Sequence, residues 1–174
     1  PGSLTIDTTG SGTDGTVTFK DAVDGAGSMV VDAGGAPVSF EDDFLADLLT
    51  LSNASHVQLA GNLQVSRVVT AAQDYSISML GADNRFSLPT NFHNTGITTL
   101  GDSASDVFLF DGGMKVAGTS NPVPLHGILR ASANGGSSPG EDLDLLGAAV
   151  TLAGASTLDL TNDGNTTPGP EDDI

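Results

Sequence analysis

Acidic side chains gather in short clusters along this chain, and their spacing could support metal chemistry. Three clusters supply carboxylate oxygens, and the third adds a hydroxyl: Asp102 with Asp106, Glu141 and Asp142 with Asp144, and Asp159 with Thr161 and Asp163. Ca²⁺ takes roughly six to eight oxygen ligands from side chains and backbone carbonyls. The clusters are therefore candidate calcium sites, but we favour the alternative that they are solvated turns that hold no ion.

The last of these clusters partly resembles an EF-type calcium loop. In "DLTNDGNTTPGPE", Asp159, Thr161 and Asp163 fall at positions 1, 3 and 5, and a glycine follows at position 6. Position 12 is Pro170, where a bidentate glutamate is expected. The match is therefore incomplete at the ligand that normally contributes two oxygens.

Catalytic motifs are scarce. The sequence contains no Gly-x-Ser-x-Gly elbow, no P-loop and no His-Glu-x-x-His motif. Arg67 and Arg85, with Asp74 and Asp83 near them in sequence, are the best candidates for the carboxylate and cation cluster of a carbohydrate-active enzyme. Isolated arginines more often form surface ion pairs. We therefore expect no catalysis, with a carbohydrate-active or carbohydrate-binding protein as the alternative.

The charge of the chain excludes several classes of partner. The 174 residues include 22 acidic and only 5 basic side chains, a formal net charge of −17. Such a surface repels phosphate backbones and anionic lipids, so we expect neither nucleic-acid binding nor membrane insertion. Cysteine is absent, which rules out disulfides and thiolate metal sites.

Short alternating segments that end in glycine indicate the fold. "VQLAG" at 57–61, "ISMLG" at 77–81 and "VTLAG" at 150–154 each place apolar residues at their first and third positions. This period of two is typical of a strand with one buried face. Gly61, Gly81 and Gly101 follow one another at steps of 20 residues, and a glycine permits a sharp corner at positive φ.

These units predict an all-β, right-handed parallel β-helix (a β-solenoid) with about 20 residues per coil and roughly eight coils. Each coil completes its core by stacking on its neighbours. The expected interior residues are Val17, Phe19, Met29, Val31, Val57, Leu59, Ile77, Met79, Val107, Leu109, Val150 and Leu152. Because Asp-Gly and Asn-Gly pairs also mark hairpins, an antiparallel β-sandwich is the alternative.

Some segments depart from this pattern. "FEDDFLADLLTL" at 40–51 is compatible with a short helix, but we favour a loop over 42–47 followed by a strand at 48–51. The stretch 131–144 is expected to protrude as a loop. Residues 1–3 read as an expression-tag scar, 4–169 as a single solenoid module, and 170–174 as a solvated tail.

The beginning and the end of the chain are similar. "LTIDTTGSGTDG" and "STLDLTNDGNTTPG" align at a spacing of 152 residues, with Asp7 on Asp159 and Gly12 on Gly164. This likeness suggests that the chain is about one period of a tandem array.

Longer stretches carry a resemblance to a known family. "GTVTFKDAVDGAGSMVVDAGG" (15–35), "GITTLGDSASDVFLFDGGMKVAGTSNPVPLHGILRAS" (96–132) and "AAVTLAGASTLDLTNDGNTTPG" (148–169) resemble the filamentous-haemagglutinin-like repeats of very large bacterial surface proteins. The resemblance implies a right-handed parallel β-helix in a giant adhesin or autotransporter-like protein. It also implies a stalk or adhesive shaft without catalysis, at the bacterial cell surface or outside the cell. Its partners would be neighbouring repeats and a protein or glycan on another cell.

Overall fold

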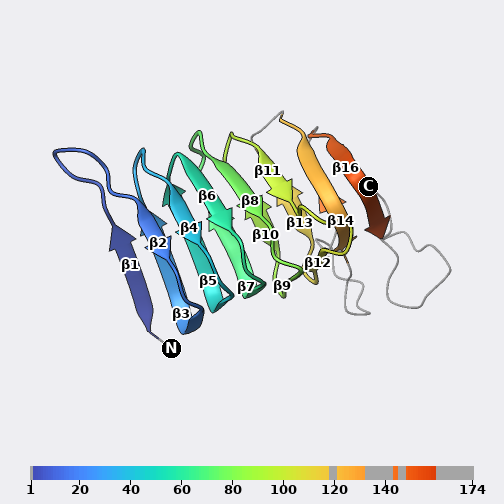
Figure 1. The fold of residues 1–174 in the computed structure, drawn as a ribbon, viewed down its shortest axis with the longest axis horizontal. Helices are drawn as coiled ribbons and strands as arrows, with labels where there is room; N and C mark the ends of the chain where they lie inside the picture. The colour runs from blue at the N-terminus through green and yellow to red at the C-terminus, as the bar shows by residue number, and fades with distance from the viewer. Residues whose placement is uncertain (1, 118–120, 132–142, 145–147, 160–174) are drawn as a thin grey trace.

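The computed structural model describes residues 2–117, 121–131, 143–144 and 148–159. All regular structure in this part of the chain is β-strand, and no helix occurs there. The strands stack side by side along the long axis of the molecule, with β1 at one end and β16 at the other (Figure 1). The predicted tail 170–174 and most of the predicted loop 131–144 lie outside the described residues.

The strands are short, and several of the longer ones turn a corner. They are β1 (Ser3–Asp7), β2 (Val17–Phe19), β3 (Val23–Asp32), β4 (Val38–Phe40), β5 (Phe44–Asn53), β6 (His56–Leu59), β7 (Leu63–Thr70), β8 (Ser76–Met79), β9 (Asp83–Phe86), β10 (Thr90–Phe92), β11 (Thr98–Leu100), β12 (Val107–Phe110), β13 (Met114–Val116), β14 (Val123–Ala131), β15 (Leu143–Asp144) and β16 (Val150–Asp159).

Every strand pair in the described structure is parallel, so the antiparallel sandwich is wrong and the β-solenoid is confirmed. A turn takes about 21 residues, close to the expected 20. The described residues form about six turns, fewer than the roughly eight expected for the whole length. Later turns are longer than 20 residues: Asp43 and Asn62 are 19 residues apart, whereas Arg130 and Asp159 are 29 apart.

The pairing partners divide each turn into three faces. The first face contains β2, β4, β6, β8, β11 and the first parts of β14 and β16. The second contains the first parts of β3, β5 and β7, then β9, β12 and the later parts of β14 and β16. The third contains β1, the later parts of β3, β5 and β7, and then β10, β13 and β15.

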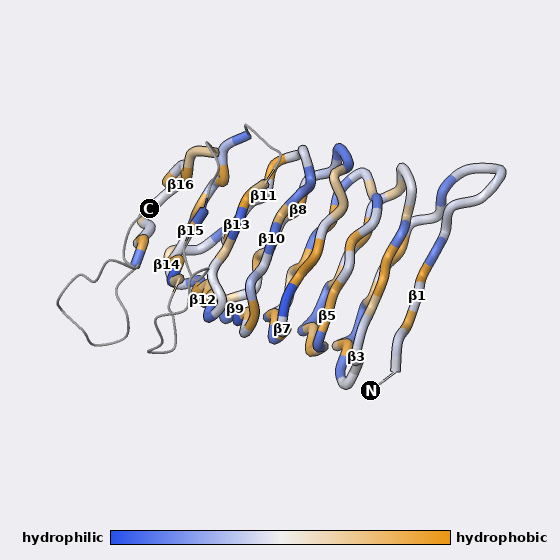
Figure 2. The backbone as a smooth tube through the Cα atoms, turned by 180° about the vertical axis from the view of Figure 1, so that it is seen from behind, coloured by the Kyte–Doolittle hydropathy of each residue, from blue (hydrophilic) through white to orange (hydrophobic). Residues whose placement is uncertain are grey.

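The core is built from columns of side chains that repeat from turn to turn, and apolar and polar stretches accordingly alternate along the tube (Figure 2). On the first face one column runs through Phe19, Phe40, Leu59, Met79, Leu100, Leu125 and Leu152. The Phe19 and Phe40 rings stack at 4.5 Å, and the Phe86 and Phe110 rings on the second face stack at 4.3 Å. Face-to-face contact between equivalent residues of adjacent turns is what this register produces.

Most expected interior residues are buried, but two were assigned to the wrong side of their strand. In β12, Phe108 and Phe110 point into the core and are fully buried, whereas Val107 and Leu109 are only partly buried on the outer side. All four residues of this strand are apolar, so alternation could not show which pair faces inward.

Two more expected interior residues lie at the end of the stack. Val150 is partly buried, and Leu152 is 59% exposed. Both belong to β16, which among the described strands pairs only with β14. They occupy core columns, but no described turn follows to cover them.

The segment predicted as a loop or a short helix is a strand. β5 begins at Phe44 and pairs with β3 on one side and β7 on the other, so residues 44–47 are not a loop. Phe44 and Ala46 point inward, and after Asp47 the inward positions become Leu49 and Leu51. This change of parity is the corner between the second and third faces. The change of parity spaces the apolar residues as in an amphipathic helix, which is why the segment was compatible with a short helix.

Two of the glycines at the strand ends, Gly61 and Gly81, do not form the expected corner at positive φ. Gly101 has φ of 77°, as predicted, but Gly61 and Gly81 have no positive φ. A Cβ on Gly61 would lie 2.2 Å from the backbone carbon of Asp42, and one on Gly81 would lie 2.3 Å from the carbonyl oxygen of Gly61. These two glycines allow adjacent turns to approach closely at the corner between the first and second faces.

Candidate functional site

The carboxylate of Asp106 organises the turn between β11 and β12. Asp106 is only 3% exposed, and its Oδ2 accepts hydrogen bonds from the backbone N–H groups of Asp102 and Ser103, both at 2.9 Å. Asp102 itself is exposed. The Asp106 carboxylate therefore contacts the backbone N–H of Asp102, not its side chain, and closes a local turn.

The carboxylates of Asp144 and Asp159 form ion pairs between adjacent turns. The Lys115 Nζ lies 2.7 Å from Asp144 Oδ2, and the Arg130 Nε lies 3.2 Å from Asp159 Oδ2. In both cases the two residues are direct partners in the strand register. Exposed pairs of this kind contribute little to stability, about 0–1 kcal/mol each.

The remaining predicted calcium ligands, Glu141, Asp142, Thr161 and Asp163, lie outside the described residues. Within the described part of the chain, no group of three or more histidine, aspartate or glutamate side chains could hold a metal ion. The calcium sites therefore stay predictions, since each predicted cluster except Asp102 with Asp106 includes residues outside the description.

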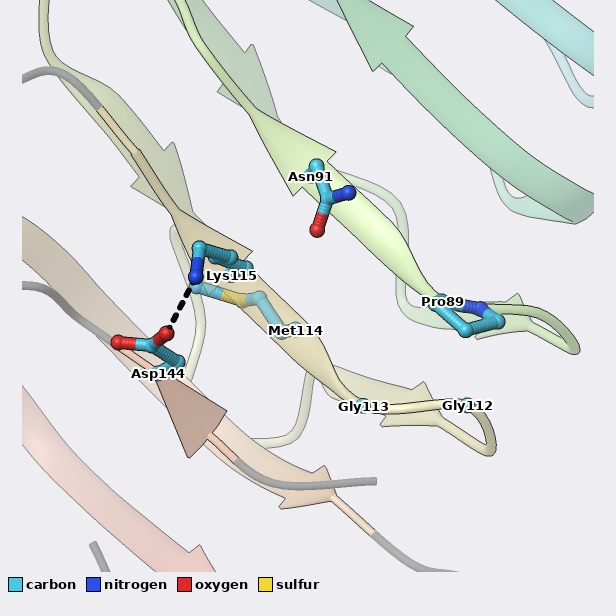
Figure 3. Close-up of a pocket in the computed structure, with 7 residues that line it drawn as sticks. All are labelled: Pro89, Asn91, Gly112, Gly113, Met114, Lys115 and Asp144. Atoms are coloured by element: carbon cyan, nitrogen blue, oxygen red, sulfur yellow. Dashed lines mark hydrogen bonds and ion pairs between the residues drawn. The ribbon is translucent and has the colours of Figure 1, made fainter. Parts of the chain in front are cut away.

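A small hollow surrounds the pair of Lys115 and Asp144 (Figure 3). It has a volume of about 160 Å³ and is lined by Pro89, Asn91, Gly112, Gly113, Met114, Lys115 and Asp144. The lysine and the aspartate point toward each other, so the two charges neutralise each other. The hollow offers hydrogen-bonding groups but only a single carboxylate.

The arginines considered for an enzyme do not converge. Arg85 lies on the second face, and its Nη2 is 2.7 Å from Oδ2 of Asp111 in the next turn. The Asp111 side chain is only 6% exposed, so this is the most enclosed of the three described ion pairs. Arg67 lies on the third face, where it is exposed. The structure therefore pairs Arg85 with Asp111 and separates it from Arg67.

Sequence reasoning missed two buried asparagines that tie turns together. Asn84 is fully buried: its Oδ1 accepts from the Leu63 N–H at 3.3 Å, and its Nδ2 donates to the carbonyls of Gly81 and Val107 at 2.5 and 3.2 Å. Asn94, also fully buried, donates from Nδ2 to the carbonyl of Tyr75 at 3.2 Å. A polar residue at an inward position of the strand pattern was the only sequence signal.

Near Asn94, a buried tyrosine continues this polar corner. The Tyr75 hydroxyl donates a hydrogen bond of 2.7 Å to the Leu51 carbonyl in the preceding turn. Thr70 Oγ1 accepts from the backbone N–H groups of His93 and Asn94 at 2.6 and 3.1 Å. Burial raises the pKa of the Tyr75 hydroxyl to about 12. The hydroxyl is therefore a neutral donor at physiological pH.

The outer side of the first face carries no charge along its central column. The outward residues at the middle of each strand are Thr18, Ser39, Gln58, Ser78, Thr99, Pro124 and Thr151. In a chain with a net charge of −17, a neutral column rich in hydroxyl groups is a distinct surface. In the sequence, these residues can be recognised because each lies between two inward-facing residues of its strand.

Among the described residues, no helix is long and apolar enough to cross a membrane. Comparisons with models of known protein families, with curated proteins and with solved structures find no match. Fold and geometry are therefore the basis for a functional proposal.

Proposed function

We propose that this chain is a structural and adhesive module of a large secreted or surface-anchored bacterial protein, acting as a stalk or binding surface without catalysis. One observation carries the proposal: the parallel ladder continues from β1 to β16 with its core columns in register. A stack built in this way extends in one direction and separates its two ends along the long axis (Figure 1). The resemblance to filamentous-haemagglutinin-like repeats supports the same function.

The side chains reinforce the stack in its growth direction. Three ion pairs, Arg85–Asp111, Lys115–Asp144 and Arg130–Asp159, each join one turn to the next. The buried amide of Asn84 joins three turns in the same direction. Contacts of this kind stiffen a rod, because bending the stack would separate them on one side.

The partners fit this geometry. Neighbouring repeats of the same protein would continue the ladder at its two ends. A partner-cell protein or glycan would bind along its sides. The acidic surface would keep long arrays soluble and apart from one another.

Two measurements test this proposal. Small-angle X-ray scattering of the monomer should give a compact, slightly elongated particle, because about six turns at about 4.8 Å each span about 30 Å. Beads coated with the chain should adhere to target cells more than beads coated with an unrelated acidic protein. A scattering profile of an expanded, flexible chain would contradict the stalk. Adhesion equal to that of the control beads would contradict the adhesive role.

The uncharged column of the first face favours a second candidate, carbohydrate binding. Hydroxyl and amide groups repeat there at the spacing of adjacent strands, about 4.8 Å, which suits hydrogen bonding to a neutral polysaccharide. Titration with neutral polysaccharides should show binding that Gln58→Glu weakens and that Thr50→Glu, on the third face, leaves unchanged. Equal effects of the two variants would place the glycan elsewhere.

A further inference from the structure

The two ends of the stack expose core columns that are closed everywhere between them. In the column that runs from Phe19 to Leu152, Phe40 is 1% exposed and Leu125 is 0% exposed. Leu152, the last residue of this column, is 59% exposed, and Phe19, the first, is only partly buried. The same column is therefore open at both ends of the described structure.

The N-terminal end is an open strand edge with apolar groups behind it. β1 pairs only with β3, and β2 pairs only with β4, within the described structure. One side of the Phe19 ring stacks on Phe40 at an interplanar angle of 9°, which leaves its other side toward the end. At the same end of the stack, a hollow of about 320 Å³ is lined by Gly2, Ser3, Leu4, Val23, Asp24, Gly25 and Met29.

The C-terminal end presents the complementary edge. β16 pairs with β14 on one side, and no other described strand lies on its second side. Val150 and Leu152 continue the two columns of the first face, and Leu158 continues the column of Val23 on the second face. These three columns have an apolar residue at both ends of the described structure.

We propose that a second copy of this chain docks head to tail wherever no repeat of the same chain occupies these ends, with its N-terminal edge on the β16 edge of the first. The register that joins successive turns then places Val17 on Val150, Phe19 on Leu152 and Val23 on Leu158. Unpaired strand edges of this kind are templates for pairing with another chain. Because the two surfaces differ, the contact is heterologous and leaves a free edge at each end, so association continues beyond a dimer.

The match between the two edges favours a second copy of this chain as the occupant. Both edges belong to one parallel ladder, and their columns have the same spacing and the same apolar character. A protein of unrelated fold would not bring apolar groups to all three positions in this register. The hollow at the N-terminal end lies beside Val23, where Leu158 of the other copy would arrive.

Charge opposes this contact and makes it dependent on salt. The same register sets Asp24 of one copy against Asp159 of the other, and each copy has a net charge of −17. Repulsion between exposed charges is screened at high ionic strength. Association should therefore be stronger in high salt than in low salt, whereas contacts made mainly by ion pairs would weaken.

Sedimentation velocity over a range of protein concentrations, in about 20 mM and about 500 mM salt, tests the proposal. We expect a series of oligomers beyond the dimer that grows with concentration and with salt. Leu152→Lys should weaken association at least about tenfold. The matched control is Leu45→Lys, because Leu45 is 48% exposed but lies on β5, which is paired on both sides. Asp24→Asn should strengthen association in low salt.

Three results would overturn the proposal: a monomer at every concentration in both salts, a dimer that grows no further, or equal effects of Leu152→Lys and Leu45→Lys. None of them bears on the shape or adhesion of the single chain, so failure here is distinguishable from failure of the proposed stalk function. Far-UV circular dichroism of each variant shows whether it retains the β-structure before its association is interpreted.

Discussion

Replacing the buried Asn84 by alanine should destabilise the protein far more than the loss of one surface amide. The Asn84 side chain is fully buried and makes three hydrogen bonds, one to an N–H and two to carbonyl groups. These backbone groups belong to Leu63, Gly81 and Val107, which lie in three successive turns. An alanine leaves all three without this partner and opens a small void.

The magnitude follows from the number of groups left behind. A buried donor or acceptor without its partner costs about 1–3 kcal/mol. Water reaching the void and small shifts of the turns would recover part of this cost. We therefore expect Asn84→Ala to lower the free energy of unfolding by about 3–5 kcal/mol, a large fraction of the stability of a typical domain.

Asn62 provides the matched control in the neighbouring turn. It lies only partly buried at the same corner, and its Oδ1 accepts a single hydrogen bond from the Asp83 N–H at 2.9 Å. Asn62→Ala should cost about 1 kcal/mol. Urea denaturation followed by circular dichroism measures both values. If Asn84→Ala costs no more than Asn62→Ala, the inward amide does not hold the turns together and our reasoning is refuted.

Four further predictions concern the core, the corners and the charges. Phe110→Ala should cost about 3–5 kcal/mol in urea denaturation, and Phe19→Ala clearly less because its ring is only partly buried; equal costs would contradict the stacked core. Gly61→Ala should lower Tm sharply while Gly10→Ala, which has open space around it, leaves Tm nearly unchanged; a tolerated Gly61→Ala would disprove the close approach. The pKa of Tyr75 is raised to about 12 from its usual 10.0, so the unfolded chain loses this proton first as the pH rises. The free energy of unfolding should therefore be constant below pH 10 and fall between about pH 10 and 12. Tyr75→Phe should remove this part of the alkaline loss, and an identical pH profile of the variant would contradict the role of Tyr75. If the acidic clusters bind calcium, millimolar Ca²⁺ should raise Tm and excess EDTA should reverse the rise, whereas an unchanged Tm would leave them as solvated turns.

The strand pattern predicted the fold because burial in a solenoid is periodic along the chain. Val57 and Leu59, then Ile77 and Met79, alternate with polar residues and are buried as expected. Where the alternation failed, the prediction failed too. β12 is apolar on both sides, and β5 changes parity at its corner, so neither segment shows its inward face in the sequence.

The polar contacts between turns could not be predicted in the same way. Arg85 was considered with Asp83, its neighbour in sequence, but its partner is Asp111, 26 residues away. Choosing that partner requires the length of the intervening turn, which is longer than the 20 residues expected. The roles of Asn84 and Asn94 depend on corner geometry in the same way, because only the folded turn brings backbone groups to their side chains.

The unequal lengths of the turns have a consequence for what the surface of this protein can become. Between 19 and 29 residues separate equivalent positions in successive turns, yet the strands on either side stay in register. Where the additional residues are described, as at 101–106 between β11 and β12, they lie outside the paired strands and disturb no column of the core. Insertions at such sites are therefore the route by which a lineage of these proteins could acquire new surface loops, or by which an engineer could display a foreign peptide, while the underlying scaffold stays the same.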